Sequence, residues 1–183
     1  MQDIPPDVTF SVANEIGGPL TPVTIVKDYL GNGVDFAVFE LKTSKAYPVF
    51  ELGTEKGMRV GDRVINPNFA LGLGKQLSRG VISSETLPIT RDCDAECASG
   101  FLVQMYGAPG SSGSPVFSES THKIIGICVY GFDGVVGFTV EPISKFAAFL
   151  AAPGQPRPTP EAEDGTDSPD PHSSIIIIVG PKE

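Results

Sequence analysis

Apolar and polar residues alternate along much of the chain as far as about residue 142. In DVTFSVA, Val8, Phe10 and Val12 fall on one face of an extended chain, and DFAVFEL alternates in the same way. A period of two residues is typical of β-strands. We therefore expect strands at residues 7–13, 22–26, 35–41, 46–52, 62–69, 79–87, 100–106, 114–120, 123–131 and 134–140. Roughly ten short strands at close spacing, joined by turns such as GNG and GFDG, predict an all-β antiparallel barrel or sandwich.

The pattern becomes helical near the end of this series. In EPISKFAAFLAA, Ile143, Phe146 and Leu150 recur at helical spacing, which indicates an amphipathic helix. Pro142 suits a first helical turn, because its missing N–H group would have no partner there. We expect one short C-terminal helix at 141–152.

The composition changes again after residue 152. Residues 153–174 contain no apolar residue larger than alanine, and proline recurs. Such a segment cannot bury enough surface to offset its ordering entropy, so we expect a folded domain at 1–152 and a proline-rich, acidic, disordered tail at 153–183. The apolar run IIIIV (175–179) in that tail could add a strand to its own barrel or to a partner, or could have no use.

Length and charge narrow the classes of function. The chain has 183 residues and a formal net charge of −9. An acidic chain repels phosphate, which argues against nucleic acid and anionic membrane surfaces as partners. The sequence shows no signal peptide and no run of about 20 apolar residues, so we expect no membrane span. The compartment and the oligomeric state stay open.

Three cysteines are present, two of them in RDCDAEC and one in a predicted strand. Cys93 and Cys97 have no second pair of ligands nearby, which argues against a zinc site. They are either loop thiols or a single bridge. Cys128 is expected to be a buried strand residue. We expect no metal and no organic cofactor.

The stretch GAPGSSGSPVF (107–117) crowds glycine, proline and serine just before an apolar segment. Acyl transfer by serine needs an exposed Oγ at a sharp turn, beside backbone N–H groups that hold the developing oxyanion. Glycine permits such a turn and lets a substrate approach closely. A serine in a lone turn of this kind is more often a simple turn hydroxyl, so the rest of the chain decides its meaning.

Residues 110–115, GSSGSP, resemble the nucleophile turn of trypsin-like (chymotrypsin-fold) serine proteases. The resemblance implies that Ser112 is the nucleophile and that the N–H groups of Gly110 and Ser112 form the oxyanion hole. The segment VDFAVFEL is similar to the strand start that carries the aspartate of the catalytic triad in this family. Asp35 is therefore the candidate triad aspartate.

Other segments agree in order with the same family. GDRVINPNFALGLGKQLSRGVIS (61–83) resembles a strand–loop–strand unit of the bacterial Deg/HtrA-type members, and KIIGICVYG and VVGFTVEPISKF resemble the closing strands and the C-terminal helix. The resemblance covers about residues 8 to 150. It implies a two-barrel antiparallel Greek-key chymotrypsin-like fold, with the first barrel incomplete, and a short C-terminal helix.

The resemblance further implies an extended polypeptide substrate that pairs with the edge of strand 126–131. Ser112 would attack the scissile carbonyl to give an acyl-enzyme, which water then releases. The side-chain pocket would involve Tyr106, Val129 and Gly131. Because no acidic residue lies near position 106, we expect a preference for small or apolar side chains rather than for lysine or arginine.

The mechanism of this family also needs a histidine, and none precedes Asp35. We expect His122 to face solvent in a hairpin, about 15 Å or more from Ser112 by strand geometry. His172 lies in the predicted tail, where ordering would be costly. Loss of one triad member costs on the order of 10^4 to 10^6 in turnover, so this chain alone should be a poor protease.

Three interpretations follow, in this order of preference. The chain is an N-terminally incomplete serine endopeptidase whose histidine lies upstream of Met1. Alternatively, it is a catalytically inactive pseudoprotease that acts as a peptide-binding module. Third, it is an unrelated β-domain, and the resemblance is a coincidence.

Overall fold

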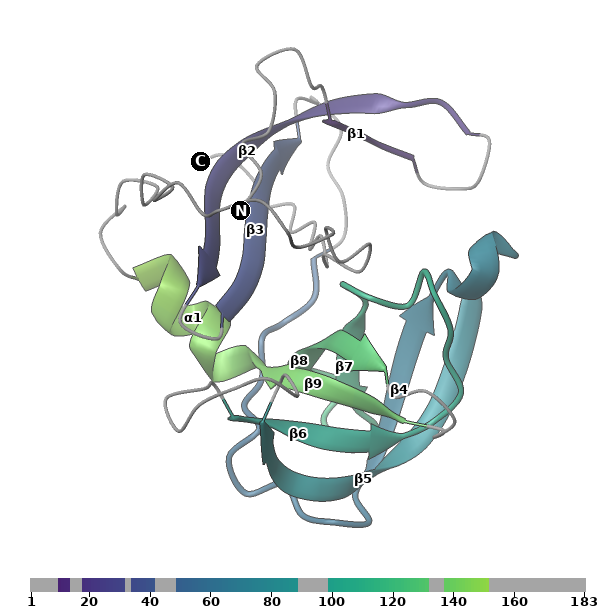
Figure 1. The fold of residues 1–183 in the computed structure, drawn as a ribbon, viewed down its shortest axis with the longest axis vertical. Helices are drawn as coiled ribbons and strands as arrows, with labels where there is room; N and C mark the ends of the chain where they lie inside the picture. The colour runs from purple at the N-terminus through teal and green to yellow at the C-terminus, as the bar shows by residue number, and fades with distance from the viewer. Residues whose placement is uncertain are drawn as a thin grey trace, which may run out of the picture.

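The computed structural model describes residues 10–13, 18–31, 34–41, 49–88, 99–131 and 137–151. Its main body is a closed antiparallel β-barrel with the strand order β4-β5-β6-β9-β8-β7 (Figure 1). The strands are β4 (Arg63–Asn68), β5 (Gln76–Pro88), β6 (Ser99–Gln104), β7 (Pro115–Ser118), β8 (Ile124–Gly131) and β9 (Phe138–Pro142). The barrel closes because β4 pairs with both β5 and β7.

A second, smaller sheet precedes the barrel in the chain. It has the order β1-β2-β3 and consists of β1 (Phe10–Val12), β2 (Thr21–Gly31) and β3 (Val34–Leu41). Figure 1 shows it as a long curved hairpin with a short third strand, separate from the barrel. The all-β, two-part antiparallel fold expected from the sequence is confirmed, with three strands where a first barrel would stand.

The helix α1 (Ile143–Ala151) lies between the two sheets (Figure 1). Ile143 and Phe146 are buried with Ile127 of β8, and Val38 of β3 packs against the same cluster. The apolar stripe read from the sequence therefore joins the helix to both sheets. Within the described part of the chain, no helix is long and apolar enough to span a membrane.

The barrel interior follows the alternation of the strands. On β4 every second residue is buried, beginning with Val64, which packs in the core with Phe101, Val116 and Val140. Adjacent strands supply residues to one shared interior because side chains alternate across each strand. Two buried positions of β4 are polar, and they bear on the site described below.

Some expected boundaries differ from the structure. Residues 49–52 form no strand, and only Leu52 makes an isolated parallel bridge, to Ile124. The aromatic ring of Phe50 instead packs edge-on against Phe117, with ring centroids 5.0 Å apart. The helix begins at Ile143 rather than at residue 141, because Pro142 still pairs with Gly126 as the end of β9.

Several predictions fall on residues outside the described ranges. They include parts of the expected strands at 7–13, 46–52 and 134–140, and the pair Cys93 and Cys97. The tail from residue 152 onward, with its run at 175–179, is also outside. The domain boundary at 152 stays a prediction.

Candidate active site

The serine-rich turn connects β6 to β7 at the end of the barrel where β4 also ends. Within it, Ser111 N–H donates to Ala108 O at 2.9 Å, and Ala108 N–H donates to Ser111 Oγ at 3.3 Å. Ser111 is fully buried by these contacts, whereas Ser112 is exposed. A nucleophile must be accessible, so the structure distinguishes the two adjacent serines in favour of Ser112.

The turn is tied to β8 on its other side. Gly113 N–H donates to Cys128 O at 2.8 Å, and Cys128 N–H donates to Ser114 O at 2.9 Å. These two bonds continue the pairing of β7 and β8 into the turn, so the backbone that follows Ser112 is held by regular hydrogen bonding.

Gly110 occupies a position that only glycine fits without strain. Its φ is +97°, and a Cβ added there would lie 2.7 Å from Phe69 O. The preceding carbonyl, Pro109 O, accepts a hydrogen bond from Leu71 N–H at 2.7 Å. In the part of the chain that the structure describes, the N–H groups of Gly110 and Ser112 make no hydrogen bond. Both N–H groups are therefore available to another acceptor beside the exposed Ser112.

Asn66 and Asn68 of β4 lie buried behind the turn, and sequence analysis missed both. Asn66 Nδ2 donates to Ser114 Oγ and to Pro115 O, each at 2.8 Å. Asn68 Nδ2 donates to Asn66 Oδ1 at 2.9 Å. The signal was available, because two polar residues sit in register with Val64 on the apolar face of a predicted strand.

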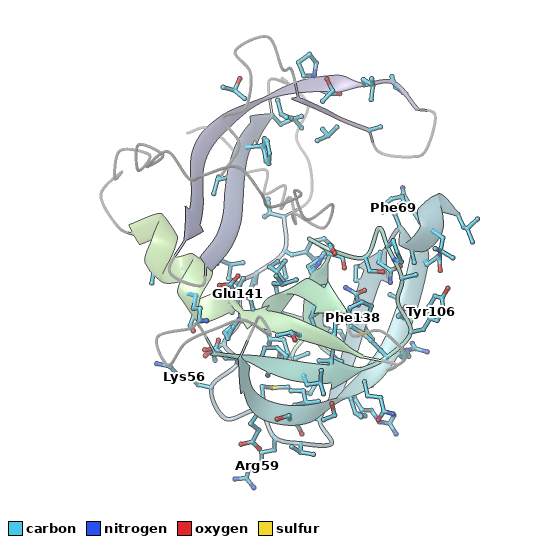
Figure 2. All side chains as sticks on the ribbon, viewed as in Figure 1. Lys56, Arg59, Phe69, Tyr106, Phe138 and Glu141 are labelled. Carbon is cyan, nitrogen blue, oxygen red and sulfur yellow. The ribbon has the colours of Figure 1, made fainter. Side chains whose placement is uncertain are left out.

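The residues expected at the side-chain pocket take different positions. Tyr106 is on the surface, with 54% of its area exposed, while Val129 is half-buried on β8. Gly131, at the end of β8, pairs with Phe138 of β9. In Figure 2, Tyr106 lies at the outer side of the barrel and Phe138 nearer its middle.

Phe138 is a buried core residue that lies beside the residues expected at the side-chain pocket, and the sequence did not indicate it. A Cβ at Gly107 would lie 1.7 Å from Phe138 Cζ, so the aromatic ring fills the space beside Gly107. The chain before Ser112 and the end of β8 thus meet around one apolar ring. The surroundings of Gly107 are therefore apolar and filled by the ring.

Asp35 lies on β3, opposite Leu30 of β2, next to the turn that joins these strands. The structure does not describe its side chain. His122 is exposed in the hairpin between β7 and β8, beyond the end of β7 that is remote from Ser112, as expected. His172 is outside the described ranges.

Cys128 is the buried strand cysteine that the sequence predicted. Burial raises the pKa of its thiol to about 12. The pKa in an unfolded chain would be near 9.0. Ionisation therefore favours unfolding as the pH rises from that value toward 12, and folded Cys128 stays a thiol at neutral pH.

We expect this thiol to resist alkylation. In a variant with Cys93→Ser and Cys97→Ser, iodoacetamide at pH 8 should modify folded Cys128 about 10^3-fold more slowly than the urea-unfolded chain, because the thiolate reacts. Mass spectrometry over time measures both rates. Equal rates would show that the thiol is accessible and ionisable in the folded protein.

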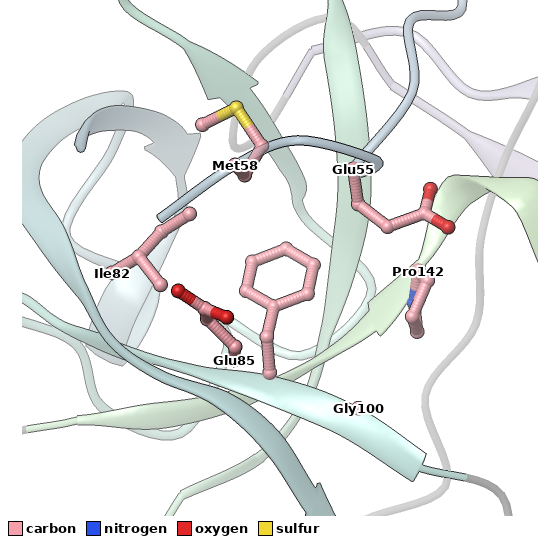
Figure 3. A pocket seen from close by; sticks show the side chains of 7 residues that line it. Glu55, Met58, Ile82, Glu85, Gly100 and Pro142 are labelled. Carbon is pink, nitrogen blue, oxygen red and sulfur yellow. The ribbon is translucent and has the colours of Figure 1, made fainter. Parts of the chain in front are cut away.

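A hollow of about 200 Å³ lies elsewhere on the barrel (Figure 3). It is lined by Glu55, Met58, Ile82, Glu85, Gly100, Phe101 and Pro142. Pro142 and Phe138 are the two ends of β9, so this hollow is at the opposite end of that strand from the serine turn. Glu55 is engaged there with Ser144 of α1. No group of three or more His, Cys, Asp or Glu residues that could hold a metal occurs in the described ranges.

Comparison with solved structures shows the same fold. The HtrA-type protease AlgW with decapeptide has a TM-score of 0.59 at 20% identity, covering 74% of this chain and 41% of that one. A serine-to-alanine variant of AlgW with tripeptide has a TM-score of 0.55 at 19% identity, covering 73% of this chain and 44% of that one. The chain therefore spans less than half the length of these proteins.

Comparison with curated proteins finds no match. A profile of the trypsin-like peptidase domain matches residues 4–127, a segment that contains the serine turn, β3, the barrel strands β4 to β7 and the first part of β8. Because this match extends over more than half of the 183 residues, the chain belongs to the family of trypsin-like peptidase domains.

Proposed function

We propose that the protein is a serine endopeptidase that cleaves extended polypeptides through an acyl-enzyme on Ser112. The observation that carries this proposal is the exposed Ser112 in a turn where the N–H groups of Gly110 and Ser112 make no hydrogen bond within the described ranges. Family membership and the peptide-bearing HtrA-type structures support it. We assign the peptidase domain to residues 1–152.

In this mechanism Ser112 Oγ attacks the scissile carbonyl. The oxygen of the tetrahedral intermediate then accepts hydrogen bonds from the N–H groups of Gly110 and Ser112. A general base takes the Oγ proton during the attack and gives it to the leaving amine as collapse breaks the C–N bond, and the acyl group stays on Oγ until water removes it. Asp35 is proposed to orient the general base. His122 does not fit the role of that base, since it lies beyond the far end of β7.

Substrate backbone would add to the end of β8. Hydrogen bonds from β7 and the serine turn reach β8 as far as Cys128, whereas Tyr130 and Gly131 pair with β9. A peptide could therefore lie along this end of β8 on the side that β7 does not cover. Tyr106 and Val129 would border the bound side chain, and Phe138 would limit its size.

A peptide-binding module without catalysis is the second candidate. It is favoured by one observation, that no histidine in the described part of the chain lies beside Ser112. A serine and an oxyanion hole without the complete triad still give about 10^3- to 10^4-fold catalysis over water. A sensitive assay can therefore separate the two functions.

We expect the full chain to hydrolyse a quenched fluorescent peptide with small apolar residues, and Ser112→Ala to remove the part of that turnover that passes through an acyl-enzyme. The matched control is Ser83→Ala, which deletes a half-buried hydroxyl that donates to Leu102 O in the barrel wall. This control should keep the wild-type rate. Saturable peptide binding without turnover in either protein would instead establish the binding module.

A further inference from the structure

We propose that Asn68, Asn66 and Ser114 form a buried hydrogen-bond relay that positions and polarises the Ser112 N–H group as an oxyanion donor. The inference rests on the proposed function, since it assigns a task to the Ser112 N–H group. These three are positioning residues, because none of them touches the reacting atoms. The relay begins in the hairpin between β4 and β5 and ends in the serine turn (residues 107–114).

The relay runs in one direction, from donor to acceptor. Ala70 N–H donates to Asn68 Oδ1 at 3.0 Å, and Asn68 Nδ2 donates to Asn66 Oδ1 at 2.9 Å. Asn66 Nδ2 then donates to Ser114 Oγ at 2.8 Å, and that hydroxyl donates to Ser111 O. Each group accepts at one end and donates at the other, so the bonds polarise one another cooperatively.

Fixed partners determine the orientation of both amides. Ala70 N–H can only donate, so the atom of Asn68 that faces it must be the oxygen. Pro115 O can only accept, and it lies 2.8 Å from the atom of Asn66 that also faces Ser114. That atom must be the nitrogen, and the Ser114 hydroxyl, which accepts from it, has its proton free for Ser111 O.

The last acceptor of the relay, Ser111 O, links it to the Ser112 N–H group. Ser111 C=O and Ser112 N–H belong to the same planar peptide group. Ser111 O accepts from the Ser114 hydroxyl and from Ser114 N–H, the latter at 3.1 Å. Two donors at this oxygen fix the plane of the peptide and withdraw charge from it, which makes Ser112 N–H a better-aimed and stronger donor.

The second oxyanion donor is held from the same hairpin. Pro109 C=O shares its peptide group with Gly110 N–H, and it accepts from Leu71 N–H at 2.7 Å. The adjacent backbone N–H groups of Ala70 and Leu71 thus begin the two routes that end at the two oxyanion donors. Gln76 Nε2, which donates to Ala70 O at 2.7 Å, holds this point of the hairpin in place.

Burial makes the relay costly to leave incomplete. Asn66 is 0% and Asn68 2% exposed, so an unmet donor or acceptor on either side chain could not turn to water. If these hydrogen bonds served only to satisfy buried polar groups, they would not need to end on the peptide group that carries the Ser112 N–H. The test must therefore measure the oxyanion site and not stability alone.

The experiment compares Ser114→Ala with Ser114→Thr in the full chain. The probes are acetylated tri-alanine with a free carboxylate and the same peptide as its carboxamide, because a carboxylate oxygen can occupy an oxyanion hole without a general base. NMR titration gives both dissociation constants, and the shift of the Ser112 amide proton reports its polarisation. Ser83→Ala is the matched control, since its lost hydroxyl lies outside the relay.

We expect wild type to prefer the carboxylate, and Ser114→Ala to lower that preference about tenfold, as for one weakened hydrogen bond to a charged group. The carboxamide should bind equally well to both, and Ser114→Thr should restore the preference and the amide shift. Asn68→Asp, which keeps the acceptor for Ala70 but removes the donor to Asn66, should lower the preference in the same way if its melting curve shows a folded protein.

The outcomes separate the relay from the proposed function. If wild type shows no preference for the carboxylate, the oxyanion site fails, and the proposed function and the relay fail with it. If wild type prefers the carboxylate and Ser114→Ala keeps that preference, the relay alone is overturned. A loss that Ser114→Thr does not restore would assign the effect to packing and would also overturn the relay.

Discussion

Replacing Gly110 by alanine should lower acyl transfer from a peptide ester by about 10^2- to 10^3-fold, the usual cost of losing one oxyanion donor. The added Cβ would lie 2.7 Å from Phe69 O, a backbone atom that also accepts a hydrogen bond from Gly72 N–H at 2.9 Å. The φ of +97° would also be strained for alanine. The turn must therefore shift, and with it the N–H group of Gly110 and the Oγ of Ser112.

Gly57→Ala provides the matched control for this prediction. Gly57 also has a positive φ, of +86°, but a Cβ there would meet nothing within 4 Å. Both variants share the backbone strain, whereas only Gly110→Ala has the clash. Single-turnover release of p-nitrophenol measures the transfer step, and thermal melting measures the strain. If Gly110→Ala and wild type transfer the acyl group at equal rates, Gly110 is not part of the oxyanion hole.

Phe138→Ala should cost about 3 to 5 kcal/mol of unfolding free energy, the range for a buried phenylalanine cut to alanine. Phe138 is only 7% exposed, and it belongs to the main core cluster together with Phe101 and Val103. Its aromatic ring also fills the space beside Gly107. The same substitution should therefore open the pocket and shift the substrate preference from small toward larger apolar side chains.

Urea unfolding followed by circular dichroism measures the stability, and a peptide series that varies the residue before the scissile bond measures the preference. Phe50→Ala is the control, because Phe50 is 65% exposed and contacts Phe117 only edge-on. Phe50→Ala should lower the unfolding free energy far less than Phe138→Ala. Lost stability with an unchanged substrate preference would place Phe138 in the core but outside the pocket.

The two-residue alternation of apolar and polar side chains predicted the barrel well, because each barrel strand turns one face to the same apolar interior. Val64 and Val116 are buried where the two-residue period places them, and the helical stripe of Ile143 and Phe146 covers the adjoining cluster. The prediction was wrong at 49–52, where Phe50 packs on Phe117 instead of entering a strand ladder. Tertiary contact there overrides a local β preference.

The sequence predicted only those site residues that are contiguous in the chain. The turn around Ser112 could be recognised because its glycines and serines are contiguous, and Gly110 has the positive φ that such a turn needs. Asn66 and Asn68 lie more than forty residues away in the chain. Only the register of β4 with β7 brings them behind Ser114. Their polarity on an apolar face was the sole local sign.

Trapping the acyl-enzyme tests the central claim most directly. The full chain would be incubated with the p-nitrophenyl ester of acetylated tri-alanine, whose good leaving group needs no general acid, then quenched in acid and digested for mass spectrometry. We predict that the acyl group is found on Ser112 and is absent from Ser112→Ala. An acyl group on another residue, or equal labelling of both proteins, would contradict the assignment of this turn as the nucleophile site.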